Sequence, residues 1–399
     1  MKAAYILDIV RTPIGKYGGT LASIRPDDLA AHIIKALIAR NVEVDPKEIE
    51  DVIFGAANQA GEDNRNVARM ALLLAGLPKE SGGVTVNRLC ASGLQAIMDA
   101  SRAVMLDESD MYIAGGVESM SRAPFVTSKA EVGFSRNQQM FDTTIGWRFI
   151  NPALSKLHYP YSMGETAENV AEKWGISRKE QDEFAYNSQL KYKTAHEEGR
   201  FREEMVSVMV PQPKSDPIIF EKDEHPRFSP VEKLASLKAA FKEGGSVTAG
   251  NSSGINDGAA ASLVISEKAV TKRGLKPLVR IVSMAIAGVD PAHMGIGPVP
   301  ATKKALKRAG LKIGDIDLVE LNEAFASQSL ACIQELDLDK NIVNVNGGAI
   351  ALGHPLGCSG TRISATLIHE MQKREDVKYG LATMCIGVGQ GAAMIFEKC

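Results

Sequence analysis

The sequence predicts an α/β protein built from two similar units, with a long polar insertion between them. Short apolar runs that end in small residues alternate with segments of helical periodicity, a pattern typical of buried strands connected by helices. The same order of short motifs occurs near both ends of the chain, which indicates an internal repeat. Between about 121 and 250 the composition becomes polar, charged and loop-rich, as expected for a functional excursion from the first unit.

The individual elements follow from these patterns in chain order. Apolar residues recur with helical spacing at 27–40, 66–76, 91–106, 178–198, 301–309 and 359–373. Apolar runs predict buried strands at 51–57, 84–87, 111–116, 261–265, 316–321 and 380–384. Strands and helices therefore alternate in both units, which predicts central strands that are covered on both faces.

The repeat depends on three matches that keep the same order in both units. A helix and its following strand, a Val-Asn pair before a helix, and an apolar glycine-rich run are all found twice. The matched segments are 35–53 and 304–319, 86–93 and 345–360, and 113–117 and 381–391. The second copy alone contains an additional segment, Gly347–Gly357, which includes His354.

Composition excludes several classes of function. The 399 residues predict two or three domains. A net charge of −2 argues against binding to nucleic acid or to an anionic membrane. The sequence contains no secretory signal and no apolar run near the roughly 20 residues that span a bilayer. Five cysteines without a CxxC pair predict a reducing, cytoplasmic location in which thiols can act as reagents.

Cys90 is the first candidate for chemistry. It lies where the predicted strand 84–87 gives way to the helix 91–106. The positive end of a helix favours a thiolate, so we expect a pKa below the usual value of about 8.5. Small residues, Ser92 and Gly93, leave room for a substrate. A buried structural cysteine is the alternative.

The Gly347–Gly357 segment provides a second candidate, His354. Its glycines make a poor core and a poor helix, and they suit a backbone wrapped closely around a ligand. An imidazole with an ordinary pKa near 6.5 is a candidate base for a cysteine. The alternative is a surface turn that happens to contain a histidine.

Cys385 and Asn322 follow predicted strands of the second unit. Cys385 ends the run 380–384 beside a glycine-rich turn, a setting that resembles that of Cys90. The repeat places both thiols on the same side of related units. Asn322 follows the strand 316–321, where it caps a helix, holds water in a site, or does both.

Taken together, these segments resemble the thiolase family, and the resemblance covers the whole chain. The segments that carry it are Asn87–Gly93, Gly115–Ser121, Ala249–Gly254, Asn322–Ala326, Gly353–Gly357 and Cys385–Gly391. The resemblance implies a five-layer αβαβα core made of two similar α/β units, plus an inserted loop domain. The implied domains are an N-terminal domain (1–120 and 251–272) with Cys90, a coenzyme A-binding loop domain (121–250), and a C-terminal domain (273–399) with Asn322, His354 and Cys385.

The resemblance also implies a role for each site residue. Cys90 takes the acyl group, His354 activates it and binds the thioester oxygen, and Cys385 exchanges a proton with the α-carbon of the acetyl unit. Asn322 positions a water in one oxyanion hole, and the backbone N–H groups of Cys90 and Gly387 form the other. The residues expected to contact coenzyme A are Arg227, Ser253, Met163, Ala324 and Phe325. No metal site is expected.

The implied activity is that of an acetyl-CoA C-acyltransferase, 3-oxoacyl-CoA + CoA = acyl-CoA + acetyl-CoA, with ping-pong kinetics. Coenzyme A thioesters are the expected substrates, without a tightly bound cofactor, and a homodimer or homotetramer is expected. Alternatives are a biosynthetic enzyme that forms acetoacetyl-CoA, a decarboxylating ketoacyl synthase, and an inactive acyl-CoA-binding protein. The ketoacyl synthases pair their cysteine with two histidines, and a second histidine motif is missing from this sequence.

Three segments, Gly61–Arg69, Arg122–Phe125 and Asp142–Phe149, resemble the 3-oxoadipyl-CoA thiolases of aromatic degradation. Arg65 or Arg148 is a candidate partner for the second carboxylate of such a substrate. Ser162 stands where acetoacetyl-CoA thiolases often have histidine, and Gly164 replaces a proline found in many 3-oxoadipyl members. Ordinary 3-oxoacyl-CoA thiolysis, as in fatty acid metabolism, therefore stays an alternative.

Overall fold

A mixed ten-stranded sheet runs through the molecule and divides into two halves. The computed structural model describes residues 2–399. Strands of the first half are ordered β4–β3–β5–β10–β1, and those of the second half β11–β14–β13–β12. The halves join through two residue pairs between β1 and β11. The strands are β1 Ala4–Arg11, β2 Gly15–Lys16, β3 Asp51–Gly55, β4 Gly82–Val86, β5 Met111–Ser119, β10 Asn256–Ser266, β11 Val279–Gly288, β12 Leu318–Leu321, β13 Tyr379–Ile386 and β14 Gln390–Lys398.

The two halves follow one plan, which confirms the predicted repeat. The order β1–α1–β3–α2–β4–α3–β5–β10 corresponds to β11–α9–β12–α10–α12–β13–β14, and a parallel bridge from Val343 to β12 takes the place of β4. The helices are α1 Pro26–Arg40, α2 Val67–Ala75, α3 Ser92–Met105, α8 Glu267–Arg273, α9 Pro298–Ala309, α10 Ala326–Leu336 and α12 Leu356–Gln372. The predicted elements agree with these bounds to within a few residues.

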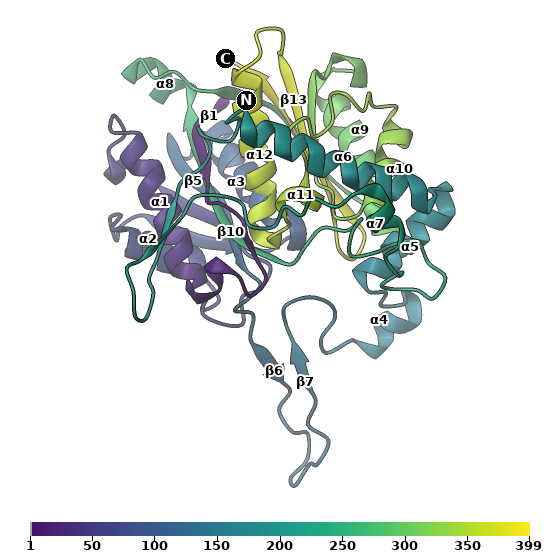
Figure 1. Ribbon diagram of the computed structural model, residues 1–399. Coiled ribbons are helices and arrows are strands. Elements are labelled where there is room, and N and C mark those ends of the chain that lie inside the picture. The colour runs from purple at the N-terminus through teal and green to yellow at the C-terminus, as the bar shows by residue number, and fades with distance from the viewer. Residues whose placement is uncertain (1) are drawn as a thin grey trace.

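Three apolar clusters separate five layers, so the predicted αβαβα core is confirmed. Helices α3 and α12 pack against each other in the middle and bury residues such as Ile97 and Ile368 between the two halves of the sheet (Figure 1). Helices α1 and α2 cover the first half from outside, and α9 and α10 cover the second. Burial on both faces explains why the central strands are continuous apolar runs.

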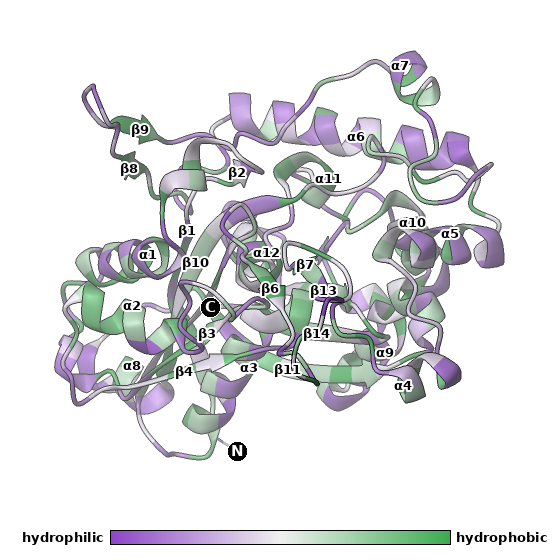
Figure 2. Cartoon of the chain, turned by 90° about the horizontal axis from the view of Figure 1, so that it is seen from below, coloured by the Kyte–Doolittle hydropathy of each residue, from purple (hydrophilic) through white to green (hydrophobic). Residues whose placement is uncertain are grey.

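The chain between β5 and β10 forms the polar excursion. It contains β6 Phe125–Thr127, β7 Met140–Asp142, α4 Pro152–Leu157, α5 Met163–Trp174, α6 Arg178–Glu197, β8 Val208–Val210, β9 Ile218–Phe220 and α7 Val231–Ala235. The β6–β7 hairpin projects from the body (Figure 1). Serine capping boxes begin both α5 and α6, at Ser162 and Ser177. Helix α6, which confirms the prediction at 178–198, is largely hydrophilic (Figure 2).

The Gly347–Gly357 segment differs from the prediction of a poor core and a poor helix. It includes one buried helical turn, α11 Ala349–Leu352. The carboxylate of Glu323 accepts the Ile350 N–H (3.1 Å) and the Ser188 hydroxyl (2.7 Å). A side chain at Gly348 would collide with Glu323. Glycine at this position therefore allows the backbone to pack closely against Glu323 in the core, and the helical turn of α11 can form directly after it.

Short 3₁₀ turns connect several of these elements: η1 Thr20–Ser23, η2 Pro46–Glu48, η3 Leu89–Ala91, η4 Pro291–Ile296 and η5 Ile313–Asp315. Within the described residues, none of the helices combines the length and the apolar character needed to span a bilayer.

Candidate active site

Two cavities meet at Cys90. The larger has a volume of about 710 Å³, and Cys90, His354 and Cys385 all line it. The smaller has a volume of about 280 Å³ and extends from Cys90 to Gly387 and Arg148. Residues that line both cavities include Cys90, Met163 and Leu356. The two predicted cysteines and the histidine, which are far apart in the sequence, therefore face one common space.

Cys90 lies in η3, directly before α3. The backbone N–H groups of Gly387 and of Cys90 itself lie near its sulfur and lower its pKa, but burial has the larger effect and raises the pKa to about 11. The prediction of a lowered pKa is therefore wrong, because the loss of hydration destabilises the thiolate more than the helix terminus stabilises it. Cys90 needs a base to react at neutral pH.

His354 lines the same cavity as this thiol and is held in one tautomer. Its Nδ1 lies 2.6 Å from the Ser359 hydroxyl, which itself donates its single proton to the Pro355 carbonyl (2.8 Å). Nδ1 must therefore carry the proton and donate to Ser359, which leaves a lone pair on Nε2. Burial first, and the charge of Arg362 second, lower the imidazole pKa to about 3. A neutral ring with an unprotonated Nε2 is suited to accept a proton.

Asn322 contacts the same imidazole. Its amide nitrogen lies 3.4 Å from His354 Nε2, and its buried Oδ1 has no hydrogen-bond partner among residues 2–399. Helix α10 begins after Phe325 without a side-chain cap, so the helix-cap alternative for Asn322 is wrong. Asn322 itself does not line either cavity, but its neighbour His354 does, and an unpaired buried carbonyl oxygen is a natural acceptor for a water or a ligand donor.

Cys385 reaches the cavity from a different position in the repeat. It lies within β13, paired with Gly391 of β14, and is 1% exposed. Burial and the neighbouring Cys90 and Cys332 hold its pKa well above the usual range. Since β13 corresponds to β5, Cys385 does not repeat the β4–α3 setting of Cys90, as the sequence had suggested. The two thiols nevertheless line the same cavity, Cys90 from η3 and Cys385 from β13.

The five residues expected to contact coenzyme A all line the larger cavity. The backbone N–H of Ser253 donates to the Ala324 carbonyl (3.0 Å). The Phe325 ring meets Phe241 edge to face at 6.2 Å. Arg227 is exposed and bonds the Ala249 carbonyl (3.2 Å). Met163, Ala324 and Phe325 pack in one apolar cluster with Cys385. The cavity is thus mainly apolar, with the charged side chains of Lys16, Glu224 and Arg227 among its lining residues.

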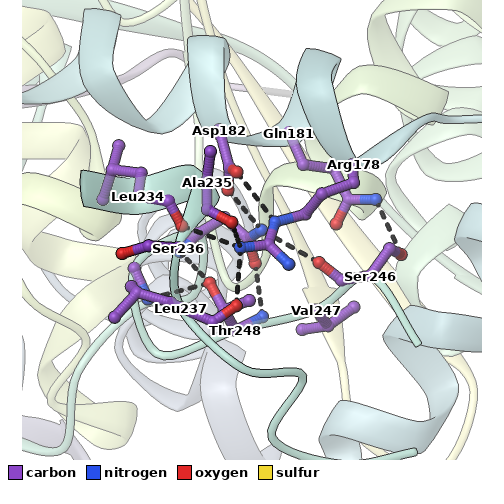
Figure 3. Close-up of polar contacts among 12 residues, drawn as sticks. Arg178, Gln181, Asp182, Leu234, Ala235, Ser236, Leu237, Ser246, Val247 and Thr248 are labelled. Atoms are coloured by element: carbon purple, nitrogen blue, oxygen red, sulfur yellow. Dashed lines mark hydrogen bonds and ion pairs between the residues drawn. The ribbon is translucent and has the colours of Figure 1, made fainter. Parts of the chain in front are cut away.

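A hydrogen-bond network joins α6 to residues 234–251 of the excursion (Figure 3). Arg178 donates to the carbonyls of Leu234 (2.7 Å) and Leu237 (2.9 Å) and pairs with Asp182 (2.7 Å). Asp182 in turn accepts a hydrogen bond from Asn251 (2.9 Å). These bonds fix the chain that leads to Phe241 and Ser253, so the excursion is anchored where it faces the cavity.

Several polar residues at the site were not identified from the sequence as functional. Glu118, at the end of β5, accepts the backbone N–H groups of Ala57, Asn58 and Gly357. Burial raises its pKa to about 7. Asn256 accepts the His354 backbone N–H (2.9 Å). An acidic residue inside an apolar, glycine-rich strand was the available signal for Glu118. Ser359 and Asn256 gave no such signal.

Comparison with known proteins agrees with this geometry. Family models described as "Thiolase, N-terminal domain" and "Thiolase, C-terminal domain" match residues 4–268 and 275–398. The chain belongs to the thiolase family. The prediction of an acetyl-CoA C-acyltransferase with this fold is confirmed.

Relatives of this thiolase extend over its full length. It is 55% identical to the 3-oxoadipyl-CoA/3-oxo-5,6-dehydrosuberyl-CoA thiolase of Escherichia coli (strain K12), with 100% of both chains covered. It is 54% identical to a beta-ketoadipyl-CoA thiolase of Acinetobacter baylyi, again over 100% of both chains. Among solved structures, an acetyl-CoA acetyltransferase of Bacillus anthracis has a TM-score of 0.94 at 42% identity, covering 100% of this chain and 99% of that one.

Proposed function

We propose that this thiolase cleaves 3-oxoadipyl-CoA with coenzyme A, giving succinyl-CoA and acetyl-CoA through a succinyl group on Cys90. The observation that carries the proposal is the convergence of Cys90, His354 and Cys385 where two cavities meet. One cavity accommodates the coenzyme A arm and the other the acyl tail. The names of the full-length relatives at 54–55% identity support the choice of substrate.

In the first half-reaction, His354 Nε2 takes the proton of Cys90, and the thiolate attacks the 3-oxo carbon. The N–H groups of Cys90 and Gly387, which face the sulfur, stabilise the resulting oxyanion. The bond between C2 and C3 breaks, and Cys385 donates its proton to C2 of the departing acetyl-CoA. His354 and a water on Asn322 stabilise the enolate oxygen meanwhile.

In the second half-reaction, coenzyme A enters the vacated cavity. The Cys385 thiolate takes the proton of its thiol, and the coenzyme A sulfur attacks the succinyl carbonyl. Cys90 departs and regains its proton from His354. Each residue thus returns to its starting protonation state, and splitting the reaction in this way produces ping-pong kinetics.

The remaining proposals concern the surroundings of the site. Residues 121–250 form the coenzyme A-binding loop domain, set between an N-terminal domain (1–120 and 251–272) and a C-terminal domain (273–399). Coenzyme A thioesters are substrates, and no tightly bound cofactor takes part. The open edge at β4 and the exposed Leu73, Leu74 and Val84 nearby support a homodimer or homotetramer. Five free cysteines suit a reducing cytoplasm.

A second candidate is the formation of acetoacetyl-CoA from two acetyl-CoA molecules. The Bacillus anthracis neighbour supports it, and the same side chains catalyse condensation when the sequence of steps is reversed. The concentrations of coenzyme A and acetyl-CoA, rather than the site, decide the direction.

Kinetics with three substrates test the proposal. The kcat/KM for 3-oxoadipyl-CoA should exceed those for acetoacetyl-CoA and a medium-chain 3-oxoacyl-CoA by about tenfold or more, an increment worth about 1.4 kcal/mol of transition-state binding. Comparable values for all three would remove the dicarboxylate assignment and leave a general thiolase.

Labelled acetyl-CoA tests the two cysteines separately. Cys90→Ala should abolish transfer of the label to the protein, because the nucleophile is gone. Cys385→Ala should still become labelled but should not condense the acetyl group, because the α-carbon keeps its proton. Normal labelling of Cys90→Ala would overturn the assignment of the nucleophile.

A further inference from the structure

The smaller cavity contains two charged residues, Glu118 and Arg148, among otherwise neutral lining. Apolar side chains such as Leu89, Ile145 and Val388 make up most of its wall. An uncharged acyl tail needs only these apolar contacts. The presence of a cation in such a wall therefore requires a separate explanation, since a buried or half-buried charge without a partner is costly.

Glu118 does not neutralise this cation. Both of its carboxylate oxygens are occupied by backbone N–H groups: Oε2 accepts from Ala57 (2.9 Å) and Gly357 (2.7 Å), and Oε1 from Asn58 (3.0 Å). These bonds turn the carboxylate toward the ends of β3 and α12. Its function is to hold the cavity wall together.

Arg148 is half-buried and forms no hydrogen bond or ion pair with any residue in the 2–399 range. Neighbouring arginines of the same region behave differently: Arg122 pairs with Glu62 (2.7 Å from Nη2 to Oε1), and Arg25 pairs with Asp27 (2.7 Å). The other arginine suggested by the sequence, Arg65, is exposed and does not line the cavity. The structure thus separates two candidates that the sequence left equivalent.

The backbone around Arg148 is fixed before any substrate binds. The Trp147 indole N–H donates to the Tyr161 carbonyl (2.9 Å). Gly146 turns the chain with φ +88°, a conformation that other residues rarely adopt. On the other side, the Asn58 amide donates to the Thr143 hydroxyl (2.9 Å). A cation on a braced segment loses little entropy when it binds an anion.

We propose that Arg148 is the specificity-determining residue that binds the distal carboxylate of the acyl group carried on Cys90. The proposal rests on the proposed function and assigns its selectivity to one side chain. Arginine offers a planar pair of N–H donors that matches a carboxylate. Since no other cation lines the cavity within the described chain, the loss of Arg148 removes the one group that distinguishes a dicarboxylic tail from a neutral tail of equal length.

The test compares 3-oxoadipyl-CoA with 3-oxohexanoyl-CoA, which has the same chain length and lacks the terminal carboxylate. The measured quantity is the ratio of their kcat/KM values. Arg148→Gln should lower this ratio about 10- to 100-fold, in line with the loss of one charge-assisted hydrogen-bonded pair. Arg148→Lys, which keeps the charge but not the fork, should recover part of the ratio. Arg65→Gln is the matched control and should leave both kcat/KM values within twofold of the wild type.

The outcomes separate the two hypotheses. A wild type that cleaves neither substrate contradicts the proposed function. A wild type that prefers 3-oxoadipyl-CoA, with a ratio unaffected by Arg148→Gln, overturns the role of Arg148 and leaves the proposed function intact. A ratio that instead falls in Arg65→Gln would transfer the carboxylate site to the exposed arginine.

Discussion

At the scale of single residues, the site combines a thiol that resists ionisation with an imidazole that resists protonation. Burial raises the pKa of Cys90 to about 11 and lowers that of His354 to about 3. Both groups are therefore neutral at pH 7, and in the proposed mechanism the proton passes from Cys90 to His354 when the thiolate attacks the substrate. The hydroxyl of Ser359 directs this exchange, because it fixes which imidazole nitrogen is free.

Ser359→Ala should lower kcat about 10-fold with little change in KM, because the imidazole loses the partner that selects its tautomer. The rate of Cys90 alkylation by iodoacetamide at pH 7 should fall in parallel, which a purely structural role would not cause. Ser364→Ala is the matched control. Ser364 is a buried serine of the same helix that bonds only the Gly360 carbonyl (2.9 Å). Equal losses in both variants would contradict this role of Ser359.

At the scale of elements, His354 depends on how the chain passes from α11 into α12. Gly353 adopts φ +102° and ψ 168°, a region open almost only to glycine. A Cβ at this position would also lie 2.5 Å from Asn256 Cγ. The Asn256 side chain in turn accepts a hydrogen bond from the His354 backbone N–H. Strand β10 of the first half therefore fixes the position of a histidine that belongs to the second half.

Gly353→Ala should therefore destabilise the protein by about 3 kcal/mol, which combines backbone strain with displacement of a buried amide. Activity should fall as well, since His354 shifts with its backbone. Urea unfolding measures the first effect and kcat the second. Gly314→Ala, in an open position with no neighbour within 4 Å, should change the stability by about 0.5 kcal/mol or less. A fully stable Gly353→Ala protein would contradict the strain argument.

At the scale of the whole molecule, several buried ionisable groups link folding to pH in opposite directions. Burial raises the pKa of Glu118 to about 7 and that of Glu320 to about 8, so their stabilising contribution is lost as the pH rises through these values. Burial, together with Arg227, lowers the pKa of His225 to about 4. That contribution is present above the unfolded value of 6.5 and is lost as the pH falls below it.

Substitution of His225 isolates its contribution to the loss of stability at acidic pH. Between pH 7.5 and 5.5 the unfolded chain gains about 0.8 proton at His225 that the folded chain does not, which costs about 1.4 kcal/mol over the whole interval. His225→Asn should lose that much less stability over this interval than the wild type, as measured by urea unfolding at both pH values. His158→Asn is the control, because His158 is exposed. An unchanged pH dependence in His225→Asn would show that this histidine takes up its proton in the folded protein.

Much of the architecture followed from the sequence because it depends on local patterns. Apolar periodicity located the strands and helices, and three short matches revealed the repeat. The order of the segments around Cys90, His354 and Cys385 was sufficient to indicate a thiolase. Charge and burial were harder to predict. A helix terminus beside Cys90 suggested a lowered pKa, whereas the effect of burial is larger and opposite.

By itself, the sequence determined the fold class and the repeat and predicted which side chains react, because residue type and spacing are local properties. Only the tertiary structure decided which groups meet. It brought Cys385 to Cys90 from a different strand position, gave His354 its tautomer through Ser359, and separated Arg148 from Arg65. These relations depend on distance and on exclusion of water. Short distances between these groups and the exclusion of water from them arise only when the two halves of the sheet pack against the central helices α3 and α12.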